Sequence, residues 1–330
     1  MCMSPELVGI LCIFLMLVMM LMKFPIAISM AVPAFLGIIY LQGFSTLTTA
    51  IQTIIWNNSY SYTLSTIPLF VLMGELLFIC GISTELFATF KAWLGRIRGG
   101  LGMATIASSG IFAAASGSSI ANTATMGVIA SKEMEKYKYS NVLTSGSIVA
   151  GGTLGVLIPP STVAIVYGML TEQSIGQLLM AGLIPGIILI LLYMLTVYVV
   201  VKIKPSLAPE STEKVSLKEK IVSLKSTIWI IVLFVIVIGG MYRGIFSPTE
   251  AAGIGAFATL IIALIRRKLT MKTFITAATS TIKTTGFLFA IIIMAFILNY
   301  FLTITKLPFM IAEFFNTLNA PVWAIFALII

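Results

Sequence analysis

The chain has 330 residues, of which 59% are hydrophobic and only 9% charged. Soluble domains average about 25% charged residues, so an arrangement of ordinary soluble domains is excluded. Apolar runs long enough to cross a bilayer recur along the chain, and we therefore predict an all-α polytopic membrane protein that uses the lipid bilayer as its solvent. In such a protein the formal net charge of +9 indicates cytoplasmic loops rich in Lys and Arg rather than binding to nucleic acid. With no histidine, and no cluster of cysteines or carboxylates, we expect no enzyme activity, no cofactor and no transition metal.

The first three apolar spans are predicted at residues 7–22, 26–42 and 64–80. The first lacks the basic n-region and small-residue cleavage site of a signal peptide, so we interpret it as a retained span. Residues 45–63 are rich in Thr, Ser and Asn and include Trp56, which favours an interfacial segment. Glu75 lies well inside the third span, where a carboxylate is a functional candidate by default. Two interpretations of Glu75 stay open, a proton or ion relay and an ion pair with a basic residue.

A segment at 99–131 lies between two charged patches, at 91–98 and 132–138, and holds an island of small and polar residues. One helix across the about 35 residues between the patches would be ~50 Å long, which is too long for a single crossing. If both patches are cytoplasmic, the segment enters and leaves the membrane on one side. It is then a re-entrant helical hairpin with its tip at 116–119. Each arm of ~15 residues would reach ~22 Å, past the midplane but short of the far surface.

The next span, at 140–170, holds a second island of small and polar residues in its middle. Pro159 and Pro160 cannot continue a hydrogen-bonded helix, and three glycines precede them. We therefore predict two half-helices joined by an extended linker. Unwound backbone in mid-membrane turns its carbonyl oxygens toward something polar, and the two islands could form one cage of neutral oxygens for an alkali cation. Half-helix N-termini would attract an anionic group of a substrate.

The candidate sodium and substrate ligands come from both islands. They are Ser116, Gly117, Ser118, Ser119 and Asn122 on the hairpin, and Gly152, Thr153, Gly155, Pro159, Pro160 and Ser161 on the broken span. The alternative is close helix packing through small residues, which we favour for Gly110, 113–115 and Gly127. For Ser118, Ser119 and Asn122 we favour binding, because three adjacent polar groups are more than close packing requires.

Further spans are predicted at 178–201, 227–246, 249–265 and 284–303, followed by a last apolar run at 319–330. Placing the charged loops 91–98, 132–138, 202–225 and 266–283 in the cytoplasm puts the N-terminus on the periplasmic side. The first three spans then run inward, outward and inward, and the broken span runs outward. The number of crossings before the loop 202–225 is odd, so any second repeat would be inverted. Glu250 follows Ser-Pro-Thr at an expected helix start, and we interpret it as a helix cap.

A weak internal sequence similarity supports such an inverted repeat, because the segment that begins at Thr66 resembles the segment that begins at Thr284. At the same offset Phe112 would correspond to Ile330, so the second repeat would be truncated. The predicted organisation has four regions: scaffold helices with the interfacial segment at 1–63, a transport-domain half at 64–176, scaffold helices with the cytoplasmic loop at 177–283, and the incomplete start of a second transport-domain half at 284–330.

Several motifs resemble the large permease subunit of tripartite ATP-independent periplasmic (TRAP) transporters, within the ion-transporter superfamily. They lie at 110–127, 151–161, 167–168, 174–176, 181–186 and 244–250, and the resemblance as a whole extends over nearly the whole chain. It implies an elevator-type symporter of two inverted repeats in the bacterial inner membrane, with sodium bound at the hairpin tip and the broken helix. It also implies a small membrane subunit and a periplasmic substrate-binding protein as partners. The substrate would be an organic anion such as a C4-dicarboxylate or sialic acid.

The chain departs from this family in length, because the family's second hairpin and second broken helix would fall after Ile330. Two alternatives to the sodium-coupled TRAP permease therefore stay open. One is a sodium–dicarboxylate symporter that works without a binding protein. The other is an inactive or truncated scaffold protein.

Overall fold

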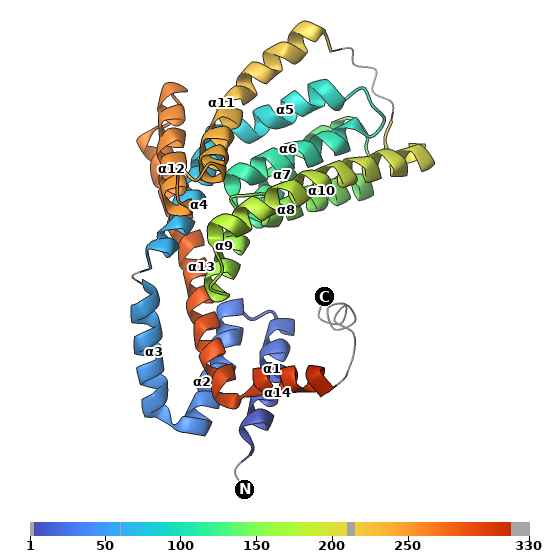
Figure 1. Ribbon diagram of the computed structural model, residues 1–330. Coiled ribbons are helices and arrows are strands. Elements are labelled where there is room, and N and C mark those ends of the chain that lie inside the picture. Colours follow the sequence, from blue (N-terminus) through green and yellow to red (C-terminus); the bar gives the residue numbers. More distant parts are fainter. Residues whose placement is uncertain (1–2, 60, 210–214, 318–330) are drawn as a thin grey trace. The chain divides into compact units, whose positions relative to one another are not determined.

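The computed structural model describes residues 3–59, 61–209 and 215–317, and the regular elements in these residues are all helices (Figure 1). The chain divides into two units, one made of residues 1–61 and 286–330 and the other of residues 62–285. The apolar run predicted at 319–330, which ends the predicted region 284–330, lies outside the described residues. Which unit acts as scaffold and which as transport domain stays a prediction.

The first unit contains α1, α2, α3, the second part of α13, and α14. Their bounds are Pro5–Leu21, Ile26–Gln42, Phe44–Ser59, Met271–Thr305 and Leu307–Thr317. Ser4 caps α1, and Gly43, with a φ of 86°, ends α2. In the core the Phe301 ring lies against Gly37, where a Cβ atom would overlap it. α1 and α2 coincide with the first two predicted spans, and the predicted interfacial segment is the helix α3.

The second unit contains a 3-10 turn, helices α4 to α12, and the first part of α13 (Figure 1). The bounds are Tyr62–Ser65 for the turn, then Thr66–Ile79, Ile82–Leu94, Gly100–Ser116, Ser119–Lys136, Asn141–Leu157, Thr162–Leu170, Ile175–Ile203, Leu217–Tyr242 and Pro248–Ile265 for α4 to α12. A second 3-10 turn at Pro205–Leu207 follows α10. The predicted hairpin is the pair α6 and α7, and the predicted broken span is the pair α8 and α9.

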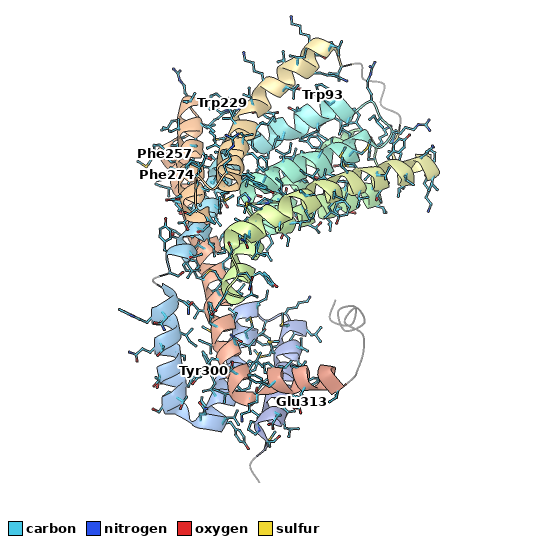
Figure 2. All side chains as sticks on the ribbon, in the orientation of Figure 1. Trp93, Trp229, Phe257, Phe274, Tyr300 and Glu313 are labelled. Carbon is cyan, nitrogen blue, oxygen red and sulfur yellow. The ribbon has the colours of Figure 1, made fainter. Side chains whose placement is uncertain are left out.

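Within the described residues, four helices are long and apolar enough to cross a membrane: α4 with its preceding turn, α10, α12 and α13. Two bent pairs raise that number to six if each is one span, namely α8 with α9, bent by 41°, and the two parts of α11, bent by 47°. Large apolar side chains on these helices face outward; Phe257 on α12, for example, is 65% exposed (Figure 2). The protein is therefore an all-α polytopic membrane protein, as predicted.

The charged segments 91–98 and 132–138 and the described residues 202–209, all predicted to be cytoplasmic, lie at one end of the second unit (Figure 1). Lys91 Nζ, near the end of α5, forms an ion pair with Glu133 Oε2 of α7 at 2.7 Å. The Ser140 N–H, just before α8, donates a hydrogen bond of 3.0 Å to the Leu207 carbonyl that follows α10. The hairpin therefore begins and ends at the same end of the unit, and its re-entry into the membrane stays a prediction. The side of the membrane that this end faces stays a prediction.

Helices α4 and α12 pack side by side and run in the same direction. Thr66 and Thr249, at the starts of the two helices, share a hydrogen bond of 2.8 Å between their hydroxyls. Further along, Met73 of α4 lies against Gly255 of α12. The predicted topology requires this parallel arrangement, because it has both spans running inward.

Several helix ends differ from the sequence prediction. α5 was not predicted, because its amphipathic sequence contains no apolar run of bilayer length, and its last turn falls in the predicted charged loop 91–98. α11 begins at Leu217, inside the predicted loop 202–225, where Ser216 and Glu219 form a capping box. α13 begins at Met271, inside the predicted loop 266–283. An apolar run predicts where a helix enters the membrane, but a helix can start earlier in charged sequence.

Candidate functional site

The hairpin turns at Gly117 and Ser118. Gly117 has a φ of 59°, in the left-handed region that glycine tolerates, and its N–H donates to the Ala113 carbonyl at 2.9 Å, which ends α6. Ser118 is extended, and its Oγ accepts a hydrogen bond from the Ala121 N–H, which caps α7. A glycine followed by a serine thus breaks the helix where the sequence predicted the tip.

The broken span is interrupted at residues 158–161. α8 ends at Leu157, Ile158 is extended, and the Pro159–Pro160 peptide bond is cis. Ser161 then caps α9, because its Oγ accepts from the Ala164 N–H at 3.2 Å and donates to the Val156 carbonyl. The two prolines end one helix and the serine starts the next, as predicted.

The hairpin tip and the break in the span are in direct contact. The Gly117 carbonyl accepts two hydrogen bonds from Thr162, one from its N–H at 3.1 Å and one from its Oγ1 at 2.9 Å. A Cβ atom on Gly117 would lie 2.6 Å from the Pro160 carbonyl oxygen, so only glycine fits here. The two polar islands predicted from the sequence therefore meet at one place in the second unit.

Glycines on the surrounding helices allow this close contact. A Cβ atom on Gly155 would lie 2.9 Å from the Ser119 nitrogen, and one on Gly152 would overlap the Thr123 hydroxyl. On α10, Gly186 lies against Ile158 in the same way, with 2.7 Å between its ideal Cβ position and Ile158 Cγ1. For Gly152 and Gly155 the structure therefore gives a packing role, and a role in binding stays a prediction.

Asn122 joins three helices just below the tip. It is fully buried, and its Nδ2 donates to the Ser109 carbonyl of α6 at 3.1 Å and to the Gly151 carbonyl of α8 at 3.2 Å. Its Oδ1 and the Ser116 Oγ are buried oxygens without a hydrogen-bond partner among the described atoms. Among the predicted ligands, these two buried oxygens lack a partner, and they can accept a ligand, since buried polar atoms ordinarily have a partner.

The predicted ligands do not all lie at the contact between tip and break. Ser116, Gly117, Ser118, Ser119, Asn122, Gly155, Pro159, Pro160 and Ser161 surround it. Thr153 instead is exposed, donates to the Ala150 carbonyl and contacts the Tyr193 hydroxyl of α10 at 3.3 Å. Thr162 was not among the predicted ligands, although its position directly after the proline pair and Ser161 is a signal for a helix start at the break.

The two carboxylates singled out in the sequence have different surroundings. Glu250 forms a capping box with Ser247, with hydrogen bonds of 2.8 and 3.3 Å, so its interpretation as a cap is confirmed. Glu75 Oε1 accepts a hydrogen bond of 2.6 Å from the Ser280 hydroxyl of α13. The choice between a relay and an ion pair for Glu75 stays a prediction.

The site offers hydroxyl, amide and carbonyl oxygens as possible ligands. Among the described residues, no three His, Cys, Asp or Glu side chains gather in one place. Neutral oxygens suit a hard alkali cation, and they hold it without a compensating charge in the membrane. The two helix breaks therefore bring neutral oxygens to one buried place, and the binding of a cation there stays a prediction.

A model of the family described as tripartite ATP-independent periplasmic transporter, DctM component, matches residues 13–330. The C4-dicarboxylate TRAP transporter large permease protein DctM of Pseudomonas aeruginosa is 36% identical over 270 residues, which cover 82% of this chain and 62% of the relative. The sialic acid TRAP transporter large permease protein SiaM of Vibrio cholerae is 32% identical over 260 residues, covering 78% and 60%. The 2,3-diketo-L-gulonate TRAP transporter large permease protein YiaN of Escherichia coli is 32% identical over 268 residues, covering 81% and 62%. The chain thus spans about three fifths of the length of these relatives.

Proposed function

The chain belongs to the DctM family of tripartite ATP-independent periplasmic (TRAP) transporter components, and we propose that it serves as the large permease subunit in sodium-coupled uptake of an organic acid. The observation that carries the proposal is the contact between the Gly117 carbonyl at the hairpin tip and Thr162 at the break. This contact brings the ends of four helices to one buried place.

The four helix ends favour charges of both signs. α6 and α8 end there, and their free carbonyls give a partial negative charge that attracts a cation. α7 and α9 begin there, and their free N–H groups give a partial positive charge that attracts a carboxylate. This arrangement supports the binding of sodium together with an organic anion.

The open oxygens support the sodium part of the proposal. Leaving a buried acceptor without a partner costs about 1–3 kcal/mol, and Ser116 Oγ and Asn122 Oδ1 are two such atoms close to the helix ends. A sodium ion removes this cost at each oxygen that it takes as a ligand. Carbonyls of the unwound backbone complete the cage.

The relatives support the choice of substrate and partners. Their names specify C4-dicarboxylate, sialic acid and 2,3-diketo-L-gulonate, all of which carry a carboxylate. The proposed partners are a small TRAP membrane subunit and a periplasmic substrate-binding protein. The proposed location is the bacterial inner membrane, with a periplasmic N-terminus, and the proposed movement is elevator-like, with inverted repeats.

Uptake by proteoliposomes tests the proposal. The permease containing this chain is reconstituted with the small subunit, and the binding protein is added outside with labelled organic acid. We expect uptake to require an inward sodium gradient, and Ser119→Ala and Asn122→Ala to weaken it at least tenfold, about the effect of losing 1.4 kcal/mol of binding. Ser145→Ala is the control, since Ser145 is exposed on α8 and bonds only within that helix.

Other outcomes would favour the alternatives. Uptake that persists without sodium, or that ignores both substitutions at the tip, contradicts sodium binding there. Uptake of free substrate without the binding protein would instead favour a sodium–dicarboxylate symporter. No uptake under any condition would favour an inactive scaffold.

A further inference from the structure

The hairpin tip is bounded on a third side by α4, at Gly74. A Cβ atom on Gly74 would lie 2.7 Å from Ser116 Cα and 3.1 Å from each of the carbonyl oxygens of Ala115 and Ser116. All three neighbours are main-chain atoms of the last turn of α6. A methyl group at this position therefore has to displace either that turn or α4 itself.

α4 is held in place along its length. Thr66 binds Thr249 of α12 through a hydrogen bond of 2.8 Å, and Met73 lies against Gly255 of the same helix. Glu75, next to Gly74, accepts the hydrogen bond of 2.6 Å from Ser280 of α13. With α4 fixed on both sides of Gly74, the last turn of α6 is the part that must yield.

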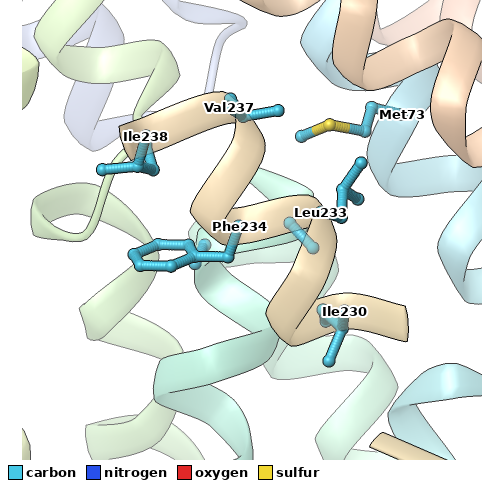
Figure 3. Close-up of a pocket in the computed structure, with 8 residues that line it drawn as sticks. Met73, Ile230, Leu233, Phe234, Val237 and Ile238 are labelled. Carbon is cyan, nitrogen blue, oxygen red and sulfur yellow. The ribbon is translucent and has the colours of Figure 1, made fainter. Parts of the chain in front are cut away.

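The last turn of α6 borders a small apolar cavity. Ala114 and Ala115 line it, together with Met73 of α4 and side chains of α11 such as Leu233 and Val237 (Figure 3). Atoms that line a cavity have fewer packing contacts to lose when they shift than atoms that are packed on all sides. A small change at Gly74 thus translates into movement of Ser116, which carries one of the two open oxygens of the site.

We propose that Gly74 is a positioning residue for the cation site: the bare main chain of α4 at Gly74 sets where Ser116, and with it the Ser116 Oγ, lies at the hairpin tip. This inference rests on the proposed function, because it concerns the same sodium site. Gly74 itself touches neither the cation nor the substrate. Its effect is on the position of the ligand supplied by α6.

The test is sodium-dependent thermal stabilisation of the full chain in detergent, with choline replacing sodium at constant ionic strength. A ligand that binds only the folded state stabilises it by RT ln(1 + [L]/Kd), so the rise of the unfolding temperature with sodium concentration gives an apparent Kd, called the sodium midpoint below. We expect Gly74→Ala to raise the sodium midpoint about tenfold and to leave the effect of choline unchanged. In a Ser116→Ala background the same change should have no further effect on the midpoint.

Gly253→Ala is the matched control, because Gly253 lies on α12 and a Cβ atom there meets nothing within 4 Å. Both variants gain the same helix propensity, so only the contact with the hairpin separates them. An unchanged midpoint in Gly74→Ala, when the wild-type chain responds to sodium, overturns the inference alone. A wild-type chain that does not respond to sodium overturns the sodium site of the proposed function and this inference with it.

A second variant covers the case in which Gly74→Ala does not fold. Met73→Ala is then combined with it, because removing the Met73 side chain from Gly255 lets α4 draw back from the hairpin. The double variant should fold and bind sodium with a midpoint within about threefold of the wild-type value. If it folds but keeps a tenfold weaker midpoint, the methyl group still acts on sodium binding and the positioning role stands. If the double variant does not fold either, Gly74 is a purely structural glycine and the positioning role is wrong.

Discussion

Replacing Asn122 by alanine removes the side chain that joins α6, α7 and α8 below the hairpin tip. The amide donates two hydrogen bonds, to the Ser109 carbonyl at 3.1 Å and to the Gly151 carbonyl at 3.2 Å, and the residue is fully buried. A neutral hydrogen bond contributes about 0.5–1.5 kcal/mol net, so the two together contribute about 1–3 kcal/mol. We expect Asn122→Ala to lower the free energy of unfolding by about 2 kcal/mol in the absence of sodium.

Asn122→Asp keeps the shape of the side chain but removes its hydrogen-bond donor. It therefore separates the effect of the donated hydrogen bonds from the effect of the cation ligand. An ionised aspartate only accepts hydrogen bonds, so a carboxylate oxygen would face the two carbonyls that Asn122 Nδ2 now satisfies. Without sodium we therefore expect Asn122→Asp to be less stable than Asn122→Ala. With sodium the order changes, because a carboxylate is a better cation ligand than an amide. Sodium should raise the unfolding temperature of the aspartate variant at least as much as that of the wild-type chain, and that of the alanine variant least.

The assay is thermal and chemical unfolding in detergent, with sodium exchanged for choline. Asn58→Ala is the matched control, because Asn58 Nδ2 donates only to the Ile54 carbonyl of its own helix, at 2.8 Å. We expect the control to lie within about 0.5 kcal/mol of the wild-type chain. An Asn122→Ala chain that is as stable as the wild type and responds equally to sodium would refute the reasoning. If the aspartate variant is more stable than the alanine variant without sodium, the two hydrogen bonds that Asn122 Nδ2 donates do not stabilise the fold as argued.

Two further predictions concern the contact between tip and break. Gly155→Ala places a methyl group against the main chain of the hairpin tip and should lower the free energy of unfolding by about 1–3 kcal/mol in the same assay, whereas Gly146→Ala, whose Cβ meets nothing within 4 Å, should be neutral or slightly stabilising. Thr162→Val keeps the shape of the side chain but removes one of the two hydrogen bonds to the Gly117 carbonyl, and should cost about 1 kcal/mol. A Gly155→Ala chain as stable as Gly146→Ala, or a Thr162→Val chain as stable as the wild type, would contradict the close contact described here.

The two helix breaks could be predicted from the sequence because their causes are local. Gly117 supplies a left-handed residue and Ser118 a cap, while Pro159 and Pro160 remove backbone donors and Ser161 supplies the next cap. Each of these signals acts within one turn of helix, so the sequence alone determines the position of each helix break to within a residue or two. The prediction of a hairpin followed from charge, since lipid excludes the charged patches on either side of it, and the structure places both ends of the pair α6 and α7 at one end of the unit.

The contacts between helices could not be predicted in this way. Gly74 lies in an apolar run like many others, and only the packing of α4 against α6 reveals that it faces Ser116. Thr153 illustrates the opposite case, since it belongs to the second island but faces Tyr193 on α10. Which face of a helix packs against a neighbouring helix depends on side chains that are far apart in the chain. The composition of a single apolar segment does not show which residues of another segment it will contact.

The neutrality of the site has a consequence for movement across the membrane. A charged side chain at the centre of a bilayer costs about 2.5–3.5 kcal/mol on insertion scales, and a transporter would carry that cost on every empty return. Ser116 Oγ, Asn122 Oδ1 and the Gly117 carbonyl have no net charge, and the partial charges of the four helix ends are of opposite sign in pairs. On the proposed function, the empty site is therefore neutral and the loaded site carries a cation and an anion together. Asn122→Asp should then bind sodium more tightly and yet turn over more slowly, so that in proteoliposomes both the sodium KM and the maximal rate fall. A lower KM with an unchanged maximal rate would show that neutrality of the empty site does not limit the return step.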